Sequence, residues 1–157
     1  MESFFEWLQG LSIPTWIAES ESIWSFPTVL FVHAVGMGMS AGSIFMIALR
    51  LVGVGRPLPV SSMRVLFRIF WWGFVLNFVT GSLLFAAHAT ITGHVPVYYA
   101  KLALLAIGVV LAFPLRKFVD GDGSDGVIPA SVTAMAAISL AVWVGVITTG
   151  RLIAYLQ

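Results

Sequence analysis

The stretch SFPTVLFVHAVGMGMSAGSIFMIALRLV, residues 25–52, decides the fold. It is an almost unbroken apolar run, and roughly 20 apolar residues are enough for a helix to cross the hydrocarbon core of a bilayer. The run nevertheless carries an imidazole, His33, among glycine, alanine, serine and methionine side chains. We therefore expect a membrane-spanning helix that holds a polar group for a reason.

Three more apolar runs of similar length follow, at about residues 65–92, 96–115 and 128–156. Polar segments rich in glycine or proline separate them: GVGRPLPVSS, TGHVP and DGDGSDG. The composition agrees, because 59% of the residues are hydrophobic and 10% are charged, whereas a soluble domain is about 25% charged. We predict an all-α protein, a four-transmembrane-helix bundle that forms one domain over residues 1–157, with the first span at about 25–52.

Residues 1–23 differ from the spans, because aromatic and acidic residues alternate there. Phe4, Trp7 and Trp16 stand among Glu2 and Glu6. An indole ring suits the membrane surface, since its body is apolar and its N–H is polar. We expect one or two short helices that lie in the interface.

The basic residues set an expected orientation. Six of the eight flank one side of the predicted bundle: Arg50, Arg56, Arg64, Arg68, Arg116 and Lys117. Loops rich in Lys and Arg stay in the cytoplasm, so we expect a multi-pass protein of a bacterial inner membrane with both termini in the periplasm. The net charge of +1 gives no reason to expect nucleic-acid binding, and the absence of cysteine excludes disulfides and thiolate sites.

Each predicted span carries one ionisable residue at a similar depth below the outer surface. His33, His88, Lys101 and Arg151 each lie about 7.5–9 Å from the outer end of their span, at 1.5 Å of rise per residue. Ionisable groups in a membrane usually face the interior of the bundle. The sequence therefore predicts a polar layer in the outer half of the protein.

Small and polar residues share a helix face with each histidine. Gly36 and Ser40 lie on the face of His33, and Asn77 and Gly81 lie on the face of His88. Such stripes predict a groove that could admit a flat macrocycle between the helices. Gly38 and Gly42 form a separate G-x-x-x-G pair, suited to close helix packing.

A b-type haem would use these groups directly. Its iron accepts imidazole nitrogens from facing helices, and we predict His33 and His88 as the axial ligands. His94 is an alternative to His88, and Met37 is a weaker candidate ligand. Lys101 and Arg151 would pair with the haem carboxylates. The groove residues Gly36, Ser40, Asn77 and Gly81 complete the predicted cofactor site.

Other interpretations explain the same residues. A histidine in a span can simply bond a neighbouring carbonyl, and Lys101 and Arg151 can anchor the chain to lipid phosphates. His33, His88 and methionines such as Met37 are also ligands for copper, so a copper-binding or copper-transport protein is one alternative. A structural subunit without a cofactor is another. No Asp or Glu lies within a span, which counts against a proton-coupled transporter.

A family resemblance adds to this interpretation. The runs WIAESESIWSFPTVLFVHAVGMGMSAGSIFMIALRLVGVGRP, GFVLNFVTGSLLFAAHAT and VPVYYAKLALLAIGVVLAF resemble a group of small, uncharacterised four-helix bacterial inner-membrane proteins. His33 and Lys101 more distantly resemble the His and Lys of the copper-resistance D-type domain and of the HemJ-type protoporphyrinogen oxidase. These relatives imply a four-helix bundle and, for the HemJ type, a bound b-type haem. Many relatives carry a histidine near the end of the third span, where this chain has FPLRKF.

These observations predict a membrane-embedded b-type haem protein. Three histidines allow one bis-histidine haem, and the inner half of the spans contains no histidine. We therefore expect electron transfer near the periplasmic face, either by this chain alone or as a subunit of a larger redox complex. The chain would then be an oxidoreductase component, with no substrate of its own identified by the sequence.

Overall fold

A computed structural model describes residues 2–121 and 127–156 of the chain. Every regular element in these residues is a helix: α1 (Glu2–Gln9), α2 (Ser12–Glu19), α3 (Phe26–Val52), the short 3-10 helix η1 (Val60–Ser62), α4 (Met63–Ala87), α5 (Ala89–Thr92), α6 (Pro96–Asp120) and α7 (Ala130–Leu156). Four stretches are long and apolar enough to cross a membrane: α3, η1 with α4, α6 and α7. The predicted all-α bundle of four membrane helices is confirmed.

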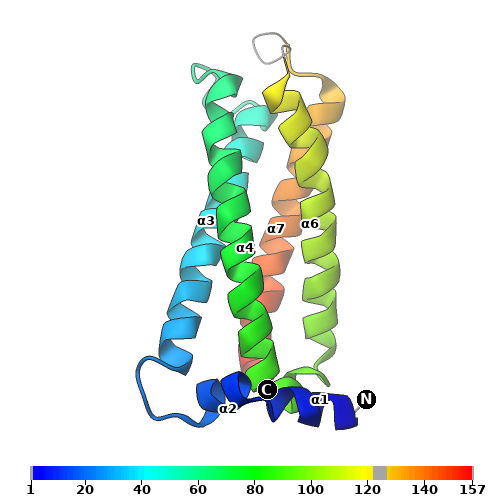
Figure 1. Ribbon diagram of the computed structural model, residues 1–157. Helices are drawn as coiled ribbons and strands as arrows, with labels where there is room; N and C mark the ends of the chain where they lie inside the picture. The colour runs from blue at the N-terminus through cyan, green and yellow to red at the C-terminus, as the bar shows by residue number, and fades with distance from the viewer. Residues whose placement is uncertain (1, 122–126, 157) are drawn as a thin grey trace.

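The four long helices run side by side, and both chain ends lie at the same end of the bundle (Figure 1). We call this the terminal end and the opposite one the arginine end, because Arg50, Arg56, Arg64 and Arg116 lie there. Helix α3 packs most extensively against α4, α6 packs against α7, and α3 also contacts α7. Helices α4 and α6 touch only sparsely. The bundle is therefore two helical hairpins joined mainly through α3 and α7.

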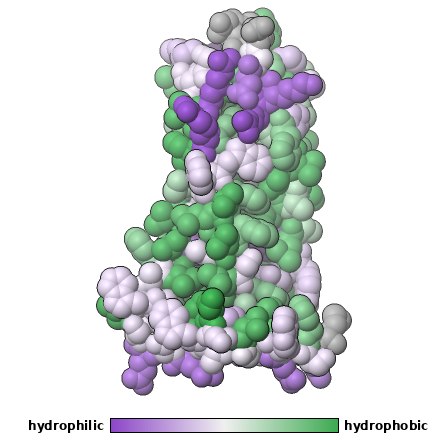
Figure 2. Space-filling view, viewed as in Figure 1, coloured by the Kyte–Doolittle hydropathy of each residue, from purple (hydrophilic) through white to green (hydrophobic). Residues whose placement is uncertain are grey.

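The surface has the pattern expected of a protein in a bilayer. Hydrophobic residues cover the middle of the molecule, and hydrophilic residues gather at its two ends (Figure 2). Large apolar side chains such as Trp72, Phe78 and Val110 are more than half exposed on the long helices. In water this exposure would be unfavourable, whereas lipid tails are as apolar as the side chains themselves. The chain is therefore built to associate with a lipid bilayer.

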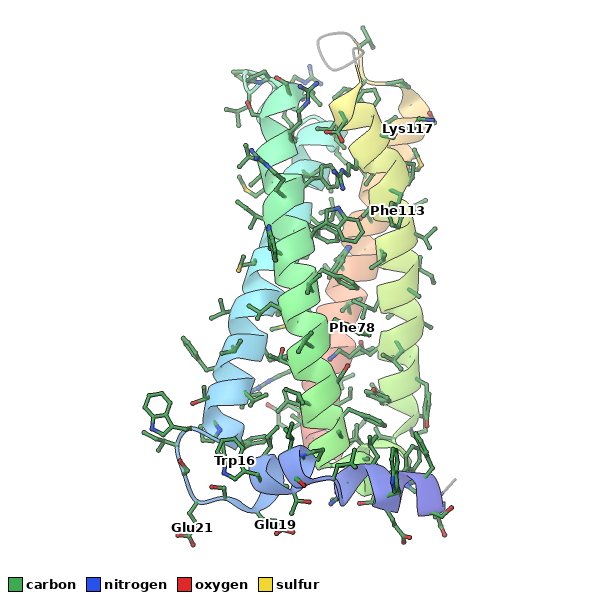
Figure 3. All side chains as sticks on the ribbon, viewed as in Figure 1. Trp16, Glu19, Glu21, Phe78, Phe113 and Lys117 are labelled. Carbon is green, nitrogen blue, oxygen red and sulfur yellow. The ribbon has the colours of Figure 1, made fainter. Side chains whose placement is uncertain are left out.

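Helices α1 and α2 lie across the terminal end, roughly perpendicular to the bundle (Figure 1). This arrangement matches the interfacial segment expected for residues 1–23. The side chain of Gln9 ties α1 to α5, since its Oε1 accepts hydrogen bonds from the Thr90 backbone N–H (3.2 Å) and the Thr90 hydroxyl (2.7 Å). Glu19 and Glu21 point away from the bundle, and Lys117 lies at the opposite end (Figure 3).

Glycines set how closely α3 and α4 approach. A Cβ atom added to Gly36 would lie 2.8 Å from the backbone nitrogen of Asn77, and one added to Gly73 would lie 2.6 Å from Cβ of Met39. Helix α3 thus crosses α4 with backbone almost against backbone. The predicted pair Gly38 and Gly42 plays no such role within the chain, because no described atom lies within 4 Å of a Cβ at either position.

Two helix boundaries differ from those expected. The second span was predicted to run to residue 92, but α4 ends at Ala87, and His88 leaves the helical region (φ −131°, ψ 32°) before α5 begins. The third span was predicted to end near residue 115, but α6 continues through Pro114 to Asp120. Arg64 of α4 stabilises this longer C-terminal end of α6, because it donates hydrogen bonds to the backbone carbonyls of Val119 and Asp120.

The densest packing lies toward the arginine end. Side chains that are at most 1% exposed there include Ile44, Ile47, Phe67, Phe70 and Leu115. Trp143 of α7 closes this core, with its ring edge-on to that of Phe70 at 5.6 Å. The terminal half is packed less completely, and a ligand-sized cavity lies in it.

Candidate functional site

A cavity of about 330 Å³ lies between the helices near the terminal end. His33 comes from α3, His88 from the junction of α4 and α5, Lys101 from α6 and Arg151 from α7, and all four line it. The structure therefore brings the four predicted ionisable residues to one space. The remaining lining residues are mostly apolar: Phe26, Leu30, Gly81, Leu84, Phe85, Thr92, Tyr98, Gly150, Ile153 and Ala154.

A second, smaller cavity of about 20 Å³ lies beside the first. His33 and Lys101 line both cavities, and Met37, Ser40 and Asn77 line only the smaller one. This volume suffices for about one water-sized group. His33 and Lys101 thus stand at the boundary between a ligand-sized space and a small one that is lined mostly by apolar side chains.

His33 is held from α4 at both its backbone and its ring. The side-chain amide of Asn77 donates a hydrogen bond of 2.9 Å to the backbone carbonyl oxygen of His33. The ring nitrogen Nδ1 lies 3.1 Å from the hydroxyl oxygen of Thr80. A Cβ atom on Gly81 would lie 3.0 Å from Cε1 of His33, so the glycine makes room for the ring. His33 therefore has a fixed place at the cavity wall.

His88 occupies the point where α4 breaks. Its ring packs edge-on against that of Phe26 on α3, with 5.4 Å between the ring centroids. Its backbone N–H bonds the Phe85 carbonyl, and its own carbonyl accepts the N–H groups of Ile91 and Thr92. The break turns the chain into α5 and leaves His88 at the cavity, which His33 also lines.

The two cations of the site form no salt bridge with a carboxylate of residues 2–121 or 127–156. Lys101 extends along α7, where its Nζ lies 3.5 Å from the position of a Cβ on Gly150. Arg151 contacts Tyr155, whose hydroxyl accepts a hydrogen bond of 3.4 Å and whose ring lies 5.4 Å from the guanidinium carbon. Among the described residues, salt bridges involve only Arg64 and Arg116, both with Asp120 at the arginine end. An anion that enters the cavity would therefore meet two cations that no carboxylate of the described residues already pairs.

The other predicted site residues to place are Gly36 and Ser40, from the predicted groove, and His94, the alternative ligand. Ser40 donates its hydroxyl to the Gly36 carbonyl at 2.9 Å, and Gly36 packs against the α4 backbone instead of lining either cavity. His94 is exposed outside both cavities, where its Nδ1–H donates to the Thr90 carbonyl at 2.7 Å and its ring contacts Phe5. These positions make Gly36 a packing residue and separate His94 from the other two histidines.

Sequence reasoning missed two side chains of the site. Thr80 bonds the His33 ring, and Tyr98 stacks on Phe85 at the cavity wall with the ring centroids 4.6 Å apart. Thr80 lies three residues after Asn77, so helical periodicity already placed it near the polar stripe of α4. Tyr98 gives no comparable sequence pattern, because its partner is set by how α4 meets α6.

The histidines define the kind of metal centre that the chain can offer. Within residues 2–121 and 127–156, no group of three or more His, Cys, Asp or Glu residues is arranged to hold a metal ion. A bare ion such as zinc usually requires three or four protein ligands, whereas the iron of haem needs only one or two.

No protein-family model, curated protein or solved structure matches the chain.

Proposed function

We propose that this chain is a b-type haem protein of the bacterial inner membrane that transfers electrons near its terminal end. One observation supports this proposal above all others: two imidazoles and two cations, from four separate parts of the bundle, line the same cavity. Ionisable side chains within a membrane are costly in free energy, and they usually mark a functional site.

The chemistry of the cavity suits haem b. Imidazole nitrogen is a common axial ligand of haem iron, and Lys and Arg side chains pair well with the carboxylates of the macrocycle. Lys101 and Arg151 are available, because neither contacts a carboxylate of the described chain. The volume of about 330 Å³ lies within the range of roughly 300–1,000 Å³ that ligand pockets occupy.

Each side chain then has a definite role. His33 would hold the iron through Nε2, and His88 would supply the second imidazole. Lys101 and Arg151 would orient the carboxylates toward the membrane surface. The apolar walls formed by Leu30, Leu84 and the stacked rings of Phe85 and Tyr98 exclude water, which favours a defined reduction potential. The bound haem would carry one electron at a time, and we propose no substrate chemistry beyond this electron transfer.

The proposed orientation places the haem near the periplasm. Six of the eight basic residues lie at the arginine end or within the turns next to it, and such residues mark the cytoplasmic side. The terminal end, with α1, α2 and the cavity, would then face the periplasm. Electrons would pass to or from a periplasmic carrier, a lipid-soluble quinol or a neighbouring subunit of a redox complex.

Copper binding is the second candidate function. His33 and Met37 both line the smaller cavity, and imidazole with thioether is a ligand set that Cu(I) accepts. In this alternative the two side chains would hold the ion together, and His88 would contribute little. A structural subunit without a cofactor is the third candidate, supported by the exposed Gly38 and Gly42 on the outside of α3.

One set of measurements separates the three candidates. The full-length chain is purified in detergent from cells supplied with haem precursor and copper. The haem proposal predicts a Soret band that shifts on reduction, a pyridine-haemochrome spectrum of b type and about one haem per chain. A colourless protein with about one copper per chain supports the copper alternative. A colourless protein without metal rejects both and leaves the structural subunit.

A further inference from the structure

The hydroxyl of Thr80 meets the His33 ring at Nδ1, and the Asn77 backbone also lies within hydrogen-bonding reach of the ring. Thr80 is 7% exposed, and its Oγ1 lies 3.1 Å from Nδ1 of His33. The same oxygen lies 2.7 Å from the backbone carbonyl of Leu76, one helical turn earlier, and 3.3 Å from that of Asn77. Two carbonyl oxygens and one ring nitrogen therefore surround a hydroxyl that has a single hydrogen to donate.

The distances assign that hydrogen. The contact with the Leu76 carbonyl is the shortest of the three, and threonine in a helix commonly bonds the carbonyl four residues back. A carbonyl can only accept, so the hydroxyl hydrogen points to Leu76. The Thr80 oxygen then presents a lone pair to His33, and a lone pair is matched by an N–H. The hydrogen of the neutral His33 ring therefore lies on Nδ1.

We propose that Thr80 is a positioning residue that holds the hydrogen of His33 on Nδ1 and so leaves the Nε2 lone pair free for a metal in the cavity. The identity of that metal as haem iron rests on the proposed function. The tautomer itself does not, because it follows from contacts within the chain. Thr80 meets the ring at Nδ1 and not at Nε2, which agrees with an Nε2 kept for a ligand.

Two neighbours of Thr80 help to position His33. Asn77 fixes the backbone of His33 by its 2.9 Å hydrogen bond, three residues before Thr80 on the same face of α4. Gly81 lies against Cε1, between the two ring nitrogens, and any larger side chain there would displace the ring. Three residues of α4 thus act on one imidazole. Asn77 holds the backbone of His33, Thr80 sets the tautomer of its ring, and Gly81 leaves room for the ring.

This hydrogen bond also tunes the ligand. A partner on Nδ1–H fixes the ring orientation and increases the basicity of the other nitrogen, and loss of such a partner typically costs about 10- to 100-fold in metal affinity. The hydroxyl oxygen of Thr80 is a neutral acceptor and its hydrogen is already committed to Leu76. Its removal is therefore expected to weaken binding without abolishing it, whereas removal of the imidazole abolishes it.

The first test reads the tautomer without any cofactor. The full-length chain, labelled with 15N in histidine and purified in detergent without added haem, is compared by NMR at pH about 8, where imidazole is neutral. A His33→Gln variant identifies the His33 signals. We expect a protonated Nδ1 and an unprotonated Nε2 in the native chain, and a mixture of tautomers in Thr80→Val. A hydrogen on Nε2 of His33 in the native chain overturns the proposal, even if the variant does not fold.

Two further variants separate the hydroxyl from its effects on packing. Thr80→Ser keeps the hydroxyl and should restore the native tautomer. Thr149→Val is the matched control, because the Thr149 hydroxyl makes the same pair of bonds within α7, 2.7 Å to the Gly145 carbonyl and 3.1 Å to that of Val146, and neither bond involves a histidine. An unchanged tautomer in Thr80→Val, or the same change in Thr149→Val, contradicts the positioning role.

The second test uses bound haem. Thr80→Val should lower haem affinity about 10- to 100-fold and shift the reduction potential, while Thr80→Ser and Thr149→Val should leave both near the native values. If the native chain binds no haem, the proposed function fails and the NMR result still decides the role of Thr80. If the native chain binds haem and Thr80→Val is unchanged in affinity and potential, the role of Thr80 fails and the function stands.

Discussion

The side-chain amide of Asn77 on α4 donates a hydrogen bond of 2.9 Å to the backbone carbonyl oxygen of His33 on α3. This bond joins the two most extensively packed helices beside the smaller cavity, which both residues line. It is a polar contact between helices that have little hydrophobic driving force to associate once both are in lipid. The same bond fixes the backbone from which the His33 ring reaches the cavity.

Replacing Asn77 with leucine should destabilise the bundle. The side chain keeps its branching and its number of non-hydrogen atoms but can no longer donate, so α3 and α4 lose about 0.5–2 kcal/mol of interaction. The measurement is reversible unfolding in mixed micelles. Ser82→Ala is the control, because the Ser82 hydroxyl bonds only the Phe78 carbonyl of its own helix. Equal stability of the two variants would show that the Asn77 bond does not hold the helices together.

An alanine at Gly73 should be more damaging than its size suggests. Its Cβ would lie 2.6 Å from Cβ of Met39 and 2.7 Å from the backbone nitrogen of Ser40, so α3 and α4 must move apart. Overpacking of this kind costs about 1–3 kcal/mol. Gly38→Ala meets no described atom within 4 Å and should leave the stability unchanged or slightly raised. The prediction fails if both variants unfold alike.

Lys101→Met should loosen haem without removing it. The substitution keeps the length of the side chain and removes the charge that we assign to a haem carboxylate, while His33 remains. Haem transfer to apomyoglobin measures the dissociation rate, which should rise several-fold. Lys117→Met changes a lysine of the same helix at the arginine end and should have no effect. Identical transfer rates for the Lys101 and Lys117 variants would exclude the carboxylate role.

The orientation can be tested with single cysteines, because the native chain has none. Glu6 on α1 and Lys117 on α6 are both exposed and lie at opposite ends of the bundle. In intact cells with a permeable outer membrane, a maleimide that cannot cross the inner membrane should label Glu6→Cys at once. Lys117→Cys should react only after the inner membrane is opened. The reverse pattern would place the cavity on the cytoplasmic side.

The sequence predicted the fold well because apolar run length is nearly sufficient to define a membrane helix. The rise per residue also placed His33, His88, Lys101 and Arg151 at one depth, and the structure brings these four side chains to one cavity. The layer was predictable because each span must begin at the same membrane surface. Whether that cavity holds haem stays a prediction.

Other features depend on contacts between helices, which the sequence does not display. The Gly38 and Gly42 pair has the spacing expected for helix packing, yet α3 crosses α4 at Gly36 and Gly73. No proline or glycine marks the break at His88, and Pro114 does not end α6. The contact between Thr80 and the His33 ring depends on the register of α3 against α4, which the sequence does not specify.

We propose that His33 binds haem iron in the cavity between the four helices. The most direct test is the haem content per chain of the purified native protein, of His33→Ala and of His94→Ala, each read from the reduced absorption spectrum. We predict about one haem in the native chain, nearly the same in His94→Ala, and none retained in His33→Ala. Equal haem content in the native chain and in His33→Ala would contradict the account.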